Sequence, residues 1–146
     1  MKSWQNLLDE FLIMYYDKKT FNHVKRVTEI AMSNPIASVL NEKILWTVCR
    51  CHDLLEDTQI TYDQLQVTLD SLIGDPFASA ALGAILSITR DDLESYSDYI
   101  KRIRYIDDNP YSYVAKLSDM KDHLLQSKTL TSKKKKKYSK AIPELL

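Results

Sequence analysis

The sequence predicts an all-α protein, a single domain of seven or eight helices that covers residues 1–146. Apolar residues recur at helical spacing along nearly the whole chain, and no stretch alternates with a period of two for long enough to indicate a strand. The 146 residues include only two glycines and four prolines, too few for the many turns of an all-β fold. The chain has the length of one domain, and an apolar content of 45% is sufficient for one core.

The first three helices are predicted from a cap, apolar stripes and a break. Ser3 can cap the first helix, in which apolar residues recur every three or four positions between residues 7 and 15. A second begins at Asn22 and is stopped by Asn34-Pro35, because the residue before a proline disfavours the helical conformation. A third is expected from about Ser38 to His52.

The remaining helices have similar signals. Thr61 and Gln64 have the spacing of a capping box at the start of a fourth helix. After a break at 74–76, residues 77–88 are almost wholly apolar, which predicts a central helix. Further helices are expected over Tyr96–Ile106, Tyr111–Leu125 and Ser132–Ile142, with a turn at 107–110 between the first two.

Charge and cysteine content restrict the partners and the compartment. Twenty Lys and Arg balance twenty Asp and Glu, so no net charge attracts nucleic acid or an anionic membrane. The longest apolar stretch, 77–88, is too short to span a bilayer, and the N-terminus does not resemble a signal peptide. Cys49 and Cys51 are expected to be buried, reduced thiols of a cytoplasmic protein. We therefore expect a small-molecule substrate as partner, neither nucleic acid nor membrane, and nothing indicates an oligomer.

The pair His52-Asp53 is the first sign of chemistry. It follows the mostly apolar stretch 44–51, where an imidazole and a carboxylate are costly to bury unless something compensates them. A divalent metal ion would do so, since imidazole nitrogen and carboxylate oxygen are both suitable ligands. Glu56 and Asp57 follow within four residues, and the alternative is a solvated, acidic helix end.

Two other segments offer partners for this pair. His23 lies in the polar opening of the second expected helix. Asp119 lies in a later helix among apolar neighbours, with Lys116 three residues before it and His123 four residues after it, so these side chains share a face. Asp119 is either paired with Lys116 or a metal ligand, and the spacing alone leaves both open.

The order His23, His52-Asp53, Asp119 on an all-α scaffold resembles the HD-domain metal-dependent phosphohydrolases. Locally, residues 52–58 read His-Asp-Leu-Leu-Glu-Asp-Thr and are similar to the His-Asp-x-x-Glu-Asp-Thr motif of the (p)ppGpp hydrolase domains of RelA/SpoT homologues. The segments 88–103, 109–119 and 130–141 also look like successive blocks of the small stand-alone members of that group. The resemblance extends from about residue 20 to the end of the chain.

This resemblance implies an HD fold and a metal-dependent hydrolase that converts (p)ppGpp into GDP or GTP and pyrophosphate. It implies one divalent ion, Mn²⁺, whose ligands would be His23, His52, Asp53 and Asp119. Glu56 and Asp57 would be the catalytic carboxylates that orient or deprotonate the attacking water.

Cations must then neutralise the phosphate charge of the substrate. The expected substrate-binding residues are Lys18, Lys19, Arg90, Tyr96, Lys101, Lys116 and His123. The last of these stands where the resembling hydrolases usually carry an asparagine that helps to bind the nucleotide.

Other readings of the same residues stay open. The metal chemistry would also serve another phosphoester, such as the 2′-phosphate of NADPH or a nucleoside monophosphate, and a non-catalytic nucleotide-sensing HD module is a further alternative. The run of five lysines at 133–137 is either a phosphate or nucleic-acid contact or the solvated start of the last helix. The zero net charge favours the solvated helix start.

Overall fold

The computed structural model describes residues 1–104, 109–126 and 131–145, and every regular element within them is a helix. The expected turn at 107–110 and the end of the helix expected to reach Ile106 lie largely outside the described residues. The elements in chain order are α1 (Trp4–Ile13), α2 (Lys18–Ser33), the 3-10 helix η1 (Pro35–Val39), α3 (Glu42–Cys51), α4 (Leu54–Asp57), α5 (Tyr62–Leu72), α6 (Phe77–Ser87), α7 (Tyr96–Ile103), α8 (Pro110–Leu125) and α9 (Ser132–Leu145). Because α4 is a single turn, eight longer α-helices are described, which confirms the predicted all-α bundle.

Several helix boundaries follow their predicted caps. Ser3 caps α1, and Thr61 forms with Gln64 the capping box that starts α5. The prediction for α2 is wrong by four residues, because the Asp17 carboxylate accepts the backbone N–H of Thr20 at 2.7 Å and starts the helix earlier.

The third expected helix is divided in two. Asn34 caps η1, and Asn41 then caps α3 by accepting the backbone N–H of Ile44. The prediction of a continuous helix from Ser38 is therefore wrong, since the asparagine cap restarts the chain at Glu42. His52 lies at the C-terminal end of α3, and the single turn α4, which was not predicted, carries Glu56 and Asp57 immediately after it.

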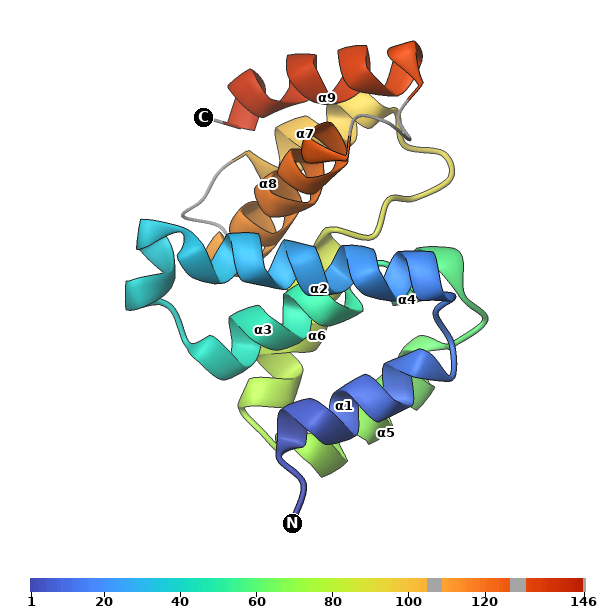
Figure 1. The fold of residues 1–146 in the computed structure, drawn as a ribbon, viewed down its shortest axis with the longest axis vertical. Coiled ribbons are helices and arrows are strands. Elements are labelled where there is room, and N and C mark those ends of the chain that lie inside the picture. Colours follow the sequence, from blue (N-terminus) through green and yellow to red (C-terminus); the bar gives the residue numbers. More distant parts are fainter. Residues whose placement is uncertain (105–108, 127–130, 146) are drawn as a thin grey trace.

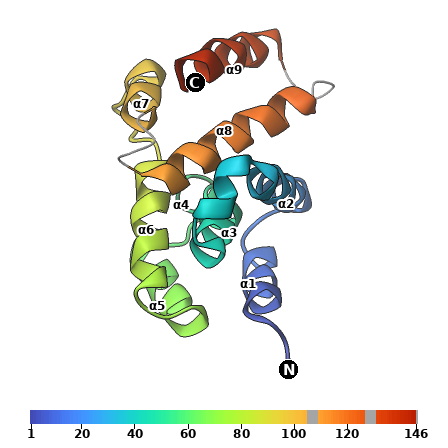
Figure 2. The ribbon, with the colours of Figure 1, turned by 90° about the vertical axis from the view of Figure 1, so that its left-hand side faces the viewer.

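The helices are arranged around α3 and α8. Figure 1 shows α2 packed alongside α3, with α1 and α5 at the end of the molecule near the N-terminus and α9 at the opposite end. Seen from the side, α8 runs obliquely over α2 and α3, and α9 covers its far side together with α7 (Figure 2). The C-terminal helix is thus placed beside the polar ends of α2 and α8.

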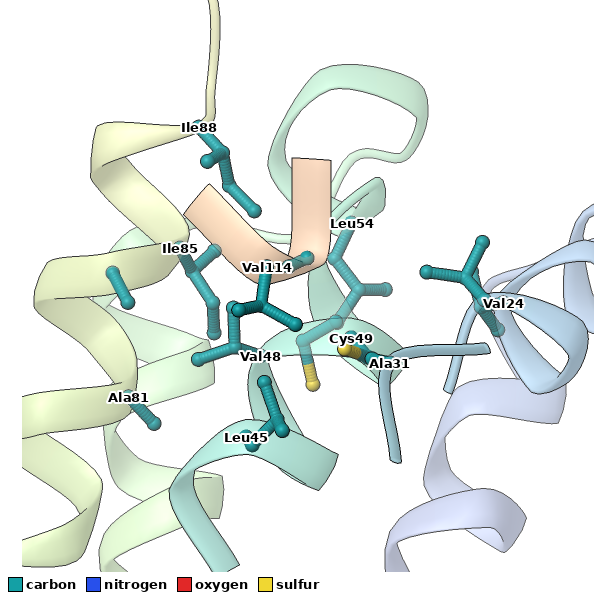
Figure 3. Close-up of a cluster of buried hydrophobic side chains, with 14 of the residues drawn as sticks. Val24, Ala31, Leu45, Val48, Cys49, Leu54, Ala81, Ile85, Ile88 and Val114 are labelled. Carbon is teal, nitrogen blue, oxygen red and sulfur yellow. The ribbon is translucent and has the colours of Figure 1, made fainter. Parts of the chain in front are cut away.

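An apolar cluster fixes the relative positions of α3, α6 and α8. Leu45 and Val48 of α3 point toward Ala81 and Ile85 of α6, with Val114 of α8 between them (Figure 3). All five side chains are fully buried. Because protein interiors are close-packed, such a cluster leaves these helices little freedom to shift, and it therefore holds the polar residues further along α3 and α8 in place.

Two further expectations concern the cysteines and the apolar stretch. Cys49 and Cys51 are both buried and free, and burial raises the pKa of each thiol. Among the described helices, none combines the length and the apolar content that crossing a membrane requires.

Candidate metal centre

Four side chains from separate parts of the chain meet at one end of the core. His23 comes from α2, His52 and Asp53 from the end of α3, and Asp119 from α8. Each offers one ligand atom, and these four atoms all lie within 4.8 Å of one another. The structure therefore brings together the four residues that the sequence singled out as metal ligands.

The imidazole of His52 is oriented by the backbone of its own helix. Its Nδ1 lies 2.7 Å from the carbonyl oxygen of Cys49, which can only accept a hydrogen bond, so the proton is on Nδ1. The other ring nitrogen, Nε2, faces the centre at 3.2 Å from both Asp53 Oδ2 and Asp119 Oδ1. A metal-ligating histidine needs this arrangement, with one nitrogen donating outward and the other free to bind.

His23 is oriented by a carboxylate that sequence analysis missed. Its Nδ1 donates to Asp122 Oδ2 at 2.7 Å, while Arg26 donates through Nε to Asp122 Oδ1 at 2.8 Å. Asp122 is only 1% exposed, so this pairing is a buried one. His23 Nε2 consequently points to the centre, 2.8 Å from Asp119 Oδ1.

The spacing of Asp122 and Arg26 in the sequence already indicated that they lie close to the candidate ligands. Arg26 follows His23 by three residues, and Asp122 follows Asp119 by three residues, so each pair lies on one helix face. Which acid would meet which histidine depends on how α2 packs against α8, and helical spacing does not determine that.

Asp119 uses its two oxygens differently. Oδ1 faces the histidines, and Oδ2 accepts a hydrogen bond from Lys116 Nζ at 2.9 Å. The two roles left open by the sequence are therefore compatible, because the ion pair with Lys116 occupies one oxygen and leaves the other toward the centre. Burial alone would raise the pKa of Asp119, but Lys116 and the surrounding histidines hold it well below its usual range.

The donor set fits a divalent cation. Burial lowers the pKa of His52, yet the neighbouring carboxylates Asp53 and Asp119 outweigh this and hold the pKa well above its ordinary value. The buried carboxylate of Asp119 and the partly buried carboxylate of Asp53 thus favour protonation of the two imidazoles whose inner nitrogens face them. A metal ion can replace those protons, and imidazole nitrogen with carboxylate oxygen suits Mn²⁺, Fe²⁺ or Zn²⁺.

A cavity of about 580 Å³ opens over this centre. Of the predicted substrate-binding residues, it is lined by Lys19, Arg90, Tyr96, Lys116 and His123. Lys18 and Lys101 are exposed and are not among the described residues that line it. Tyr99 lines the cavity beside Tyr96, and Asp17 and Thr20 also line it although the sequence did not single them out.

The C-terminal helix α9 forms one wall of the cavity. Lys134 and Lys137 line it, and Lys137 Nζ lies 4.0 Å from the centre of the Tyr96 ring. The interpretation of the lysine run as a solvated helix start is therefore incomplete. It describes Lys133, Lys135 and Lys136 but not the partly buried Lys137 or Lys134, which is exposed and yet lines the cavity. Residues one helical turn apart share a face, which is why Lys134 and Lys137 both line the cavity.

Glu56 and Asp57 lie at the rim, between this cavity and an adjoining depression of about 780 Å³. Glu56 Oε1 accepts the backbone N–H of Arg90, which ties α4 to the segment after α6. Partial burial, and then the charges of Asp53 and Glu56, raise the pKa of Asp57 to about 6. Both carboxylates line the cavity without belonging to the group of four candidate ligands.

Compared with models of known protein families and with curated proteins, the sequence gives no match. The likeness to HD-domain hydrolases therefore depends on the motifs alone. Any function assigned to the chain has to be argued from the chemistry of this site.

Proposed function

We propose that this chain is a metal-dependent phosphohydrolase of the HD type that removes the 3′-pyrophosphate from (p)ppGpp, giving GDP or GTP and pyrophosphate. The observation that carries the proposal is the convergence of His23, His52, Asp53 and Asp119, with one ligand atom of each within 4.8 Å of the others. Their order along the chain is the order of the HD signature, and α4 adds the Glu-Asp pair of the (p)ppGpp hydrolase motif.

These four residues would hold one divalent ion, with Mn²⁺ as the proposed metal. A divalent ion there supplies Lewis-acid stabilisation of phosphate oxygens and makes hydroxide available near neutral pH. The chain supplies the orientation: Cys49 and Asp122 fix the two imidazoles, and Lys116 fixes the carboxylate of Asp119. Three of the four ligands are thus held by a second group, which reduces the entropy lost when the ion binds.

The carboxylates at the rim have the role of proton acceptor. Glu56 and Asp57 line the cavity beside the centre, and a carboxylate so placed can take a proton from the attacking water. The Arg90 backbone N–H holds Glu56, so this carboxylate keeps its position relative to the cavity. A contribution of about 10²–10⁴ in rate is the usual one for such a group.

Other residues of the cavity lining carry the charge that a phosphate-rich substrate needs. Three cations, Arg90, Lys116 and Lys137, lie within 6 Å of the Tyr96 ring centre, at 5.7, 5.9 and 4.0 Å. Such a cluster can neutralise the charge that develops on the transferred pyrophosphate. The cavity volume of about 580 Å³ is in the range of small-molecule sites.

The test is product analysis after incubation of the metal-loaded protein with ppGpp, with and without Mn²⁺. We expect metal-dependent formation of GDP and pyrophosphate by the wild type and no product with His52→Ala. A protein that holds metal but leaves ppGpp intact would refute the proposed substrate, and NADPH and nucleoside monophosphates would then be assayed in the same way. A protein that binds no metal would refute the proposed chemistry and favour a non-catalytic module.

A further inference from the structure

His123 lies beside the four ligands and has no part in the function proposed so far. It follows Asp119 by one turn of α8, and its ring centre is 4.5 Å from that of His23. Its Nε2 is 3.3 Å from Asp119 Oδ1, the oxygen that also faces the other two histidines. Three imidazole nitrogens therefore surround one carboxylate oxygen, at 2.8, 3.2 and 3.3 Å.

Hydrogen bonds alone do not easily satisfy three imidazole nitrogens at one carboxylate oxygen. A carboxylate oxygen has two lone pairs and accepts about two good hydrogen bonds. A third imidazole at the same oxygen is therefore in excess. A cation at the centre removes the difficulty, because each Nε2 can then offer its lone pair and needs no proton.

The ring of His123 is also held in an orientation in which its Nε2 faces Asp119 Oδ1. It stacks on Tyr138 of α9, with ring centres 4.9 Å apart and an angle of 2° between the planes. Tyr138 is itself buried, so the stacking surface is fixed. The side chain of His123 is 33% exposed.

We propose that His123 is a fifth ligand of the metal centre, which becomes a site of three imidazoles and two carboxylates. This inference rests on the metal site of the proposed function, but it does not depend on the substrate. Additional imidazole nitrogen favours first-row transition ions, whereas Mg²⁺ prefers oxygen ligands. His123 therefore selects Mn²⁺, Co²⁺ or Zn²⁺ against Mg²⁺.

The experiment measures metal binding directly in the purified, full-length protein. Dissociation constants for Mn²⁺, Co²⁺ and Mg²⁺ are determined by calorimetry or chelator competition for the wild type and for His123→Phe. Phenylalanine retains a ring that can stack on Tyr138 but has no donor nitrogen, so packing and ligation are separated. Lys121→Ala, at an exposed position of the same helix, is the matched control. The Co²⁺-loaded proteins also give a visible absorption spectrum that reports the ligand set.

We expect His123→Phe to weaken Mn²⁺ and Co²⁺ binding by roughly 10–100-fold, to change Mg²⁺ binding by less than about threefold, and to alter the Co²⁺ spectrum. Lys121→Ala should behave as the wild type. Unchanged Mn²⁺ and Co²⁺ affinities with an unchanged spectrum would overturn the inference. If the KM for nucleotide then rose, His123 would be a substrate-binding residue in the place of the usual asparagine.

The two proposals can fail separately. A wild type that binds these metals through His123 but hydrolyses no ppGpp would contradict the proposed function and support the fifth ligand. Hydrolysis with metal binding that does not depend on His123 would do the reverse. A wild type that binds none of the three ions would refute both.

Discussion

Helices α3 and α8 each bury two kinds of residue, and the contrast between them separates stability from function. Toward one end, Leu45 and Val48 of α3 pack with α6 and with Val114 of α8, and all are fully buried. Toward the other end, the same helices bury His52 and Asp119, which are 5% and 3% exposed. Burial of apolar surface stabilises the fold, whereas burial of ionisable groups costs free energy unless each is paired.

The polar end therefore contains more pairing than a structural core requires. His52 is held by a backbone carbonyl, and Asp119 is held by Lys116. An apolar replacement of similar volume would avoid the desolvation cost that these groups carry. The comparison indicates that the apolar end positions the helices and that the polar end brings together residues that could hold a metal ion.

The largest expected effect comes from His52→Ala. Removing this imidazole deletes one of the four ligands, so we expect metal content and hydrolysis both to fall below detection. Metal analysis of the purified variant and the ppGpp assay measure these two losses.

The matched variant at the apolar end of the same helix is Leu45→Ala, which should cost about 2–5 kcal/mol in free energy of unfolding while metal stoichiometry is retained. The comparison breaks down if Leu45→Ala loses metal at a temperature where it is still folded.

Glu56→Gln should affect catalysis alone. The amide retains an oxygen that can accept the Arg90 N–H but cannot take a proton from water, so we expect kcat to fall by roughly 10²–10⁴-fold with metal content unchanged. Steady-state kinetics with saturating Mn²⁺ measure this effect. A fully active variant would show that Glu56 is not the general base and would leave Asp57 for that role.

Asp122→Asn tests the orientation of His23 without removing a ligand. The amide can present either an oxygen or an NH₂ group to Nδ1 and it loses the charge that pairs with Arg26, so the inner nitrogen is no longer fixed as the acceptor. We expect metal affinity to fall by roughly 10–100-fold, measured by chelator competition. Asp122→Glu should restore part of the affinity, and a variant with wild-type affinity would show that Asp122 contributes only to packing.

The smallest effect concerns the pH dependence of the metal-free protein. The pKa values of His23 and His52 are raised in the folded state, although burial acts in the opposite direction, because Asp119 and Asp53 favour the protonated rings. Their contribution to stability is complete below the ordinary pKa of about 6.5 and is lost as the pH rises through the folded values. In EDTA, the Tm should therefore decrease as the pH rises above about 6.5.

A bound metal ion opposes this decrease in Tm, because imidazoles lose their protons as the pH rises and then bind the ion more tightly. Melting curves with Mn²⁺ should show a Tm that is maintained over the same pH range. His52→Ala should show a smaller decrease in EDTA than the wild type. An equal decrease in both proteins would mean that other groups cause it.

Much of this molecule was determined by local sequence. The helical period, the Ser3 cap and the Thr61–Gln64 capping box are formed within one or two turns, so the sequence predicts them without reference to the rest of the chain. The four candidate ligands were found because His52, Asp53 and Asp119 are chemically costly residues in apolar settings and because the order of all four resembles a known motif. The errors at α2 and α3 also have local causes, since Asp17 and Asn41 are caps that the hydrophobic pattern does not reveal.

Tertiary structure decided which partners these residues have. Asp122 orients His23 across a separation of 99 positions, and Lys137 reaches Tyr96 from a different helix. Lys134 and Lys137 line the cavity, whereas the other three lysines of the same run do not. Helical periodicity states which residues share a face, but the packing of α2, α8 and α9 determines what each face meets. That packing follows from how the apolar surfaces of all the helices fit together, which no single segment contains.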